Sequence, residues 1–213
     1  MEAPTVMVVA VAVAGLLAEM VAWGLVARGR NIWRTMPPVL GLMGLTALVL
    51  GPPAWSPDVS AGASLTLGLA AGLVLYVATR EAFVIIGRWE PFRQHSLEMY
   101  RKQGGLSLGV ALLLSIAISV PGEELFWRGL FQGELTEALD GSGWAPLLAW
   151  LAFVLANLAS ANLAIAAGAV VGGGAWVALA WWSGGILAPL ACHVLWTGLM
   201  IAAPVVREPD PSA

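Results

Sequence analysis

The sequence predicts an all-α membrane protein, a polytopic bundle of about seven transmembrane helices. Its composition is the first reason: of 213 residues, 59% are hydrophobic and 11% are charged, and the mean hydropathy is +0.84. Soluble domains carry about 25% charged and 45–50% apolar residues. The second reason is length, because a membrane span needs about 20 apolar residues and apolar runs near that length recur along the chain.

Seven apolar segments are expected, separated by short polar or glycine- and proline-containing connections. They cover residues 5–27, 37–55, 61–79 (with a continuation to 86), 106–121, 144–158, 162–182 and 185–206. The connections between the last three are short, which favours antiparallel neighbours. Glycines in the sixth segment, at 168 and 172–174, would let a neighbouring helix approach closely, because small residues build helix contacts in membranes.

The orientation follows from the basic residues, which cytoplasmic loops carry in excess. Arginines follow the first and third segments, whereas the connections after the second and fourth segments are acidic. We therefore expect the first and third loops in the cytoplasm, the N-terminus outside and, with seven spans, the C-terminus inside. Residues 81–103 resemble an amphipathic interfacial stretch, in which His95 is expected to face solvent or headgroups.

We expect three parts of the chain. Residues 1–104 would hold the N-terminal spans and a cytoplasmic interfacial segment, residues 105–206 a helical core, and residues 207–213 a disordered tail. The N-terminus lacks the basic start of a cleavable signal, so the first segment is interpreted as a retained span. The chain has no basic tract, which argues against nucleic acid as a partner. A single lysine among ten basic residues favours a GC-rich bacterial genome.

A charged motif stands where a membrane span should exclude it. Residues 123–128 read Glu-Glu-Leu-Phe-Trp-Arg and directly follow the apolar segment 106–121. Each charge inside a membrane costs at least about 2.5 kcal/mol and usually pairs or lines a cavity. On a helix, Glu124 and Arg128 share a face and would pair. Glu123 points about 100° away, unpaired and suited to act as a general base. Pro121 and Gly122 are expected to break or bend the helix.

Two more polar clusters lie in later segments. Phe153 and Asn157 share one helical face, and so do His193 and Thr197. Any one of them alone is more typical of packing or of an interhelical hydrogen bond. Together with Glu123 they supply an acid, an amide, an imidazole and a hydroxyl, which could converge on one cavity. We expect no metal and no cofactor, because a zinc site takes three protein ligands, and the chain has one intramembrane histidine and the single Cys192.

These motifs resemble the CAAX prenyl protease and bacteriocin-processing (CPBP) family of intramembrane glutamic endopeptidases. The resemblance covers roughly residues 106–203 and makes 105–206 the catalytic core. Glu123, Glu124 and Arg128 match the spacing of the family's first motif, Phe153 begins its second and His193 its third. Two positions depart: Asn157 stands where the family usually has histidine, and Thr197 where it usually has asparagine.

The resemblance implies a metal-independent hydrolysis of peptide bonds. Glu123 would activate a water, Asn157 would orient it, and His193 with Thr197 would stabilise the oxyanion. Glu124 and Arg128 would fix the helix and the local field. The implied substrates are membrane proteins or peptides, with lipidated ones among them. The implied location is the lipid bilayer of a bacterial cytoplasmic membrane.

Two alternatives stay open. Because Asn157 replaces a histidine, the chain could be an inactive family member that binds or scaffolds other membrane proteins. It could also be a small proton-coupled transporter, with Glu19 and Glu81 as further acids, although no clear internal repeat is present. Glu19 is otherwise expected to be structural, near the inner end of its span and reaching toward the interface. On a straight helix from Gly105, Glu123 would lie about 27 Å from the cytoplasmic face, in the outer half.

Overall fold

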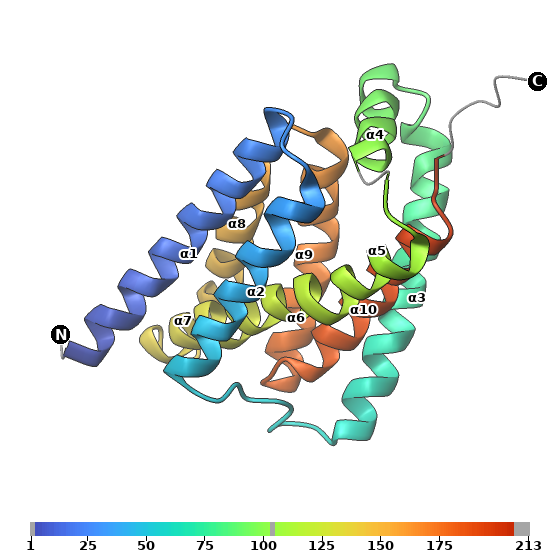
Figure 1. Ribbon diagram of the computed structural model, residues 1–213. Helices are drawn as coiled ribbons and strands as arrows, with labels where there is room; N and C mark the ends of the chain where they lie inside the picture. Colours follow the sequence, from blue (N-terminus) through green and yellow to red (C-terminus); the bar gives the residue numbers. More distant parts are fainter. Residues whose placement is uncertain (1–2, 103–104, 207–213) are drawn as a thin grey trace, which may run out of the picture.

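The computed structural model describes residues 3–102 and 105–206, and all regular structure in these two ranges is helical (Figure 1). The helices are α1 (Ala3–Ala27), α2 (Ile32–Leu50), α3 (Ala61–Ile86), α4 (Glu90–Lys102), α5 (Leu108–Leu114), α6 (Val120–Glu123), α7 (Gln132–Ala138), α8 (Trp144–Leu158), α9 (Leu163–Ser183) and α10 (Leu187–Ala202). Two π-helical stretches, η1 (Ser115–Ser119) and η2 (Glu124–Phe131), connect α5, α6 and α7. The predicted all-α bundle is confirmed. The tail predicted at 207–213 lies outside the described residues.

Seven apolar helices match the seven predicted segments. Within the described ranges, five are long and apolar enough to cross a membrane: α1, α2, α3, the continuous helix Leu108–Ala138, and α9. The other two, α8 and α10, are apolar but shorter. Large aliphatic side chains stay exposed along these helices, as expected where lipid replaces water. The chain is an integral, multi-pass membrane protein.

The second segment differs from its prediction at both ends. Helix α2 begins at Ile32 because the Asn31 side chain accepts hydrogen bonds from the backbone N–H groups of Trp33 and Arg34 and so caps the helix. The helix ends at Leu50, just before the sequence Gly-Pro-Pro at 51–53. The predicted segment, residues 37–55, therefore begins and ends later in the chain than the helix does.

The break predicted at Pro121 and Gly122 does not occur. The chain stays helical from Leu108 to Ala138, and π-helical turns flank both sides of α6. Wider turns of this kind absorb irregularities in a helix and are frequent at functional sites. The charged motif thus begins inside an unbroken helix, at the junction of α6 and η2.

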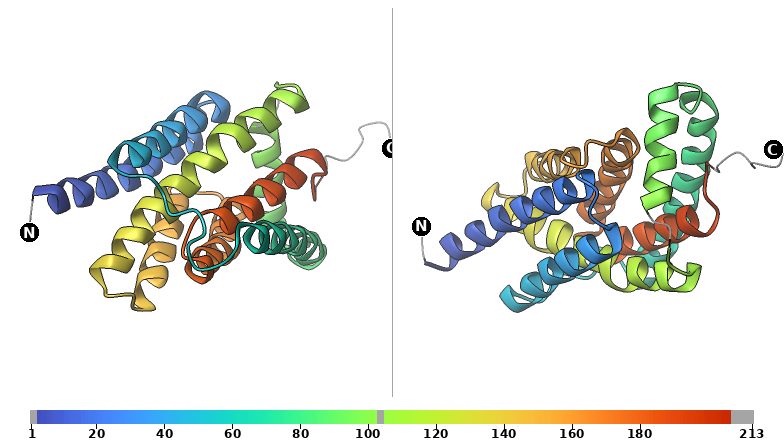
Figure 2. Two further views of the ribbon diagram at one scale, coloured as in Figure 1. Left: turned by 90° about the horizontal axis from the view of Figure 1, so that it is seen from below. Right: turned by 45° about the horizontal axis from the view of Figure 1, so that its top comes forward.

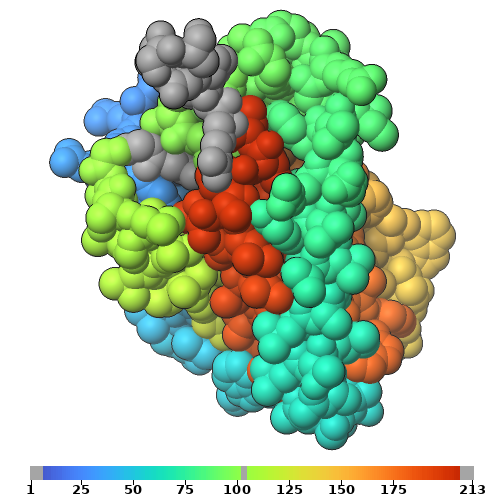
Figure 3. All heavy atoms as spheres, turned by 90° about the vertical axis from the view of Figure 1, so that its right-hand side faces the viewer, coloured from blue at the N-terminus to red at the C-terminus, as the bar shows by residue number. Residues whose placement is uncertain are grey.

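Glycines let two pairs of helices pack almost backbone to backbone. Gly122 of α6 faces α2, where an added Cβ would lie 2.2 Å from the carbonyl oxygen of Leu40. Gly72 of α3 faces α10 in the same way, 2.7 Å from the carbonyl oxygen of Cys192. Figure 3 shows α10, in red, lying between α3 and the segment that contains α5. The two contacts hold the charged helix and α10 in fixed positions.

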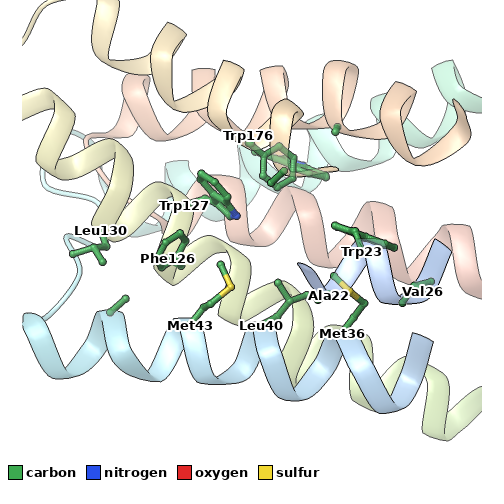
Figure 4. Close-up of a cluster of buried hydrophobic side chains, with 14 of the residues drawn as sticks. Ala22, Trp23, Val26, Met36, Leu40, Met43, Phe126, Trp127, Leu130 and Trp176 are labelled. Atoms are coloured by element: carbon green, nitrogen blue, oxygen red, sulfur yellow. The ribbon is translucent and has the colours of Figure 1, made fainter. Parts of the chain in front are cut away.

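The glycines of α9 were predicted to allow close approach of a neighbouring helix, but the structure shows aromatic rings against two of them. Gly173 lies against the ring of Phe153, and Gly172 against the ring of Trp176. They make room for aromatic side chains rather than for a neighbouring backbone. A buried apolar cluster continues from there across η2 to α2, where Phe126 and Trp127 face Met43 (Figure 4).

Helix α4 lies at one end of the molecule, beside the end of α3, and is anchored there (Figures 1 and 2). The backbone N–H of Leu163 donates to Nδ1 of His95 at 3.0 Å, and the Asn162 side chain donates to the His95 carbonyl at 2.9 Å. The prediction that His95 faces solvent or headgroups is wrong. It satisfies one of the N–H groups that the start of a helix leaves unpaired and so docks α4 on α9.

We predict that Gly122→Ala destabilises the fold by about 1–3 kcal/mol, the usual cost of overpacking, because the new methyl group would overlap Leu40. The matched control is Gly133→Ala, since an added Cβ there has no neighbour within 4 Å and alanine is the better helix former. Thermal unfolding of both variants in detergent measures the difference. Equal melting temperatures would contradict the proposed contact.

Candidate active site

Four of the six predicted site residues border one cavity. Its volume is about 430 Å³, and Glu123, Asn157, His193 and Thr197 all border it. Most other lining residues are apolar and come from α2, α3, α4 and α9. Four residues separated by up to 74 positions in the sequence thus border the same largely apolar chamber.

The other two predicted residues, Glu124 and Arg128, lie behind this wall. Both side chains have no solvent exposure, and Arg128 Nη1 lies 3.2 Å from Glu124 Oε1. The predicted pair is therefore confirmed. The same Glu124 oxygen lies 2.7 Å from Nδ1 of His193. This second contact links η2 to α10 and was not predicted, because nothing in the local sequence relates positions 69 apart.

Glu123 and His193 face each other at the cavity. Oε2 of Glu123 lies 3.7 Å from Nε2 of His193. The imidazole therefore lies between two acids, bonded through Nδ1 to Glu124 and directed with Nε2 toward Glu123. A carboxylate that accepts from Nδ1–H fixes the tautomer and the orientation of the ring, so Nε2 is the nitrogen available for chemistry.

Aromatic rings enclose the charged groups. Trp176 stacks on the His193 ring, with centroids 3.5 Å apart and planes at 16°. The Arg128 guanidinium lies 4.5 Å from the centroid of Phe153 and 5.3 Å from that of Trp176. Within the described residues, its nitrogens find no partner in hydrogen-bond geometry. The ion pair with Glu124 and the cation–π contacts help to stabilise this buried charge.

Asn157 is hydrogen-bonded to Glu19, a residue that was predicted to reach toward the membrane interface. Its Nδ2 donates to Glu19 Oε1 at 3.2 Å and to the Phe153 carbonyl at 3.0 Å. Trp127 donates to the other oxygen of Glu19 at 2.7 Å. Glu19 has no exposed surface, so the expectation that it reaches toward the interface is wrong. No local pattern marks this contact, since Glu19 and Asn157 are 138 positions apart.

Two further candidate residues, Thr197 and Glu81, lie in different surroundings. Thr197 is half-buried, borders the cavity and lies one helical turn after His193. Glu81, considered above as an acid for transport, is exposed on α3. In the two described ranges, no three His, Cys, Asp or Glu side chains are arranged to hold a metal ion.

The arrangement can perform acid–base chemistry on a bound carbonyl compound. An acid, a histidine supported by a second acid, an amide and a hydroxyl all border one chamber. Comparison with protein-family models shows that residues 105–199 match "Type II CAAX prenyl endopeptidase Rce1-like". This match confirms the family predicted from the motifs and includes all six predicted site residues. No curated protein and no solved structure matches the chain.

We predict that Glu124→Ala destabilises the fold by about 3–5 kcal/mol, because it leaves the Arg128 charge buried without its partner. Adding Arg128→Met to the same chain should recover much of this loss, since an apolar side chain can replace a buried ion. Glu137→Ala is the control, because Glu137 is exposed on α7 and such changes stay within about 0.5 kcal/mol. Thermal unfolding in detergent compares the variants; a melting temperature for Glu124→Ala equal to that of the control would contradict the burial of this charge.

Proposed function

Since residues 105–199 belong to the type II CAAX prenyl endopeptidase family, we propose that this intramembrane endopeptidase hydrolyses peptide bonds with a water activated by Glu123. The observation that carries the proposal is the approach of Glu123 to His193, at 3.7 Å, on the wall of a largely apolar cavity. The inactive scaffold and the transporter considered from the sequence have no specific contact in their favour.

Glu123 is the proposed general base. It takes one proton from water while the water oxygen attacks the carbonyl carbon of the scissile peptide. The same proton then passes to the departing amine as the carbon–nitrogen bond breaks. Positioned acids and bases contribute about 10²–10⁴-fold to such reactions. Its place on the cavity wall, beside the Glu124–Arg128 pair rather than within it, supports this role.

His193 is the proposed donor to the oxyanion. Glu124 accepts from Nδ1 and stabilises positive charge on the ring, as the buried acid of a serine-protease triad does for its histidine. In this positively charged, doubly protonated ring Nε2 also carries a hydrogen, which can donate to the negative oxygen of the tetrahedral intermediate. Thr197 supplies a hydroxyl from the next turn of α10 and is proposed to assist. This division needs no metal ion.

The substrates are membrane-embedded proteins, as membership of a membrane protease family implies. We propose a C-terminal segment with a lipidated cysteine as the preferred class, because the chamber is mostly apolar and large enough for an alkyl chain beside the peptide. The lining includes Leu75, Phe83, Ile165 and Met200. Farnesyl or geranylgeranyl groups on a cysteine followed by three residues are the lipids that fit this description.

We propose that substrate enters from the cytoplasmic side of a bacterial membrane. The chamber extends to α4, whose Phe92, Met99 and Tyr100 border it, and α4 lies in the region where arginines cluster. Tyr100 donates to the carbonyl of Met200 at 3.2 Å. Burial raises the pKa of Tyr100 to about 12, so its hydroxyl remains a donor and fixes α4 beside the chamber.

We predict that Glu123→Gln lowers cleavage by about 10²-fold or more while the protein remains folded, because an amide cannot accept the proton. The assay uses a fluorogenic peptide with a farnesylated cysteine three residues from its C-terminus, and a peptide without the lipid tests the proposed preference. Glu137→Gln is the matched control and should cleave normally. Unchanged cleavage by Glu123→Gln, or loss of wild-type cleavage in EDTA, would contradict the mechanism.

We predict that a cysteine at Glu98 reacts with an impermeant maleimide from the cytoplasmic side, and a cysteine at Gly143 from the opposite side. Both positions are exposed. Gly143 precedes α8, whose 15 residues span about 22 Å before the turn that contacts α4. Cys192 is buried and gives the background. Comparing the labelling of intact cells with that of inverted vesicles determines the orientation of the protein in the membrane. The reverse pattern would place the chamber on the outer side.

A further inference from the structure

Glu19 contributes a buried acid to the site from outside the family match. Helix α1 precedes residues 105–199, yet the Glu19 carboxyl group is fully buried against η2 and α8. Burying an acid is costly unless hydrogen bonds compensate it. Two do so here, one from Trp127 and one from Asn157, each to a different oxygen.

The hydrogen bonds fix which way the Asn157 amide points. An amide offers two N–H donors and one carbonyl acceptor. Both donors are used, one by Glu19 and one by the Phe153 carbonyl. Because both of these partners are acceptors, the reverse orientation would set the amide oxygen against them. Oδ1 takes part in neither of these two hydrogen bonds. Because Asn157 borders the cavity together with Glu123, Oδ1 is the atom that it can offer to a molecule bound there.

We propose that Glu19 is a positioning residue that locks the Asn157 amide so that Oδ1 accepts a hydrogen bond from the nucleophilic water. One water hydrogen then points to Oδ1 while Glu123 removes the other, which directs a water lone pair toward the substrate carbonyl. Asn157 takes no proton at any stage. The inference rests on the proposed function, since it concerns the same water.

Trp127 completes the arrangement. Its indole N–H donates to Oε2 of Glu19 at 2.7 Å, which leaves Oε1 for Asn157. Trp127 is itself nearly fully buried and packs edge-on against Phe153. Trp127, Glu19 and Asn157 therefore form one chain of hydrogen bonds from the apolar core to the cavity wall.

The test is a double-mutant cycle on the full chain in detergent, with the farnesylated fluorogenic peptide as the probe. The variants are Glu19→Gln, Asn157→Ala and both together, with Glu137→Gln as the matched control. In Glu19→Gln the new amide N–H can donate to Oδ1 of Asn157, so the Asn157 amide is no longer held in one orientation. We expect each single variant to lower kcat about 10- to 100-fold, the range for an outer partner of catalytic ligands in metalloenzymes. KM should stay within about twofold, because the substrate contacts remain. The double variant should lose no more than the worse single one, because both act through one water.

Two results would overturn the inference: an unchanged kcat in Glu19→Gln, or losses that multiply in the double variant. A purely structural Glu19 would instead lower the melting temperature and the active fraction, with kcat per active molecule unchanged. If Glu19→Gln does not fold, Glu19→Asp replaces it, since the shorter acid retracts from Asn157 and should lower kcat in the same way. Cleavage that survives Glu123→Gln overturns the proposed function itself. Cleavage lost with Glu123→Gln but normal with Glu19→Gln overturns this inference alone.

Discussion

The hydrogen bond from His193 to Glu124 joins the charged helix to the last helix of the bundle, and the site depends on it. At 2.7 Å in a buried setting, it sets the rotation of the imidazole and therefore which nitrogen meets Glu123. The same Glu124 oxygen lies near Arg128, so a single carboxylate balances a cation and orients a ring. Trp176 then covers the imidazole face. Each of these contacts is stronger for being out of water, because a low dielectric enlarges electrostatic interactions.

Such charges can be placed inside a membrane protein only if the surrounding helices stay close. Gly122 allows α2 to contact α6, and Gly72 allows α3 to contact α10. The π-helical turns around α6 keep the backbone helical through Pro121. The result is an unbroken helix that carries two acids and an arginine without presenting them to lipid.

The sequence alone predicted the all-α architecture, because hydropathy reports spans. It also selected, from four-residue spacing, candidate residues of which four border one cavity. The pair of Glu124 and Arg128 is local and was predicted correctly. Contacts between distant helices were not, since they depend on packing: Glu124 with His193, Glu19 with Asn157, and His95 with the start of α9. The continuous helix through Pro121 was missed for a related reason, because neighbouring helices decide whether a proline bends a membrane span.

The hydrogen bond from Trp127 to Glu19 ties the half of the chain that carries the family match to the half that does not. A fragment limited to the matched residues would lack this acceptor, and Gly122 would lose the helix that covers it. The matched residues therefore do not form a structural unit that is independent of α1 and α2. A substitution in α1 or α2 would therefore disturb the contacts of Asn157 and Gly122 directly.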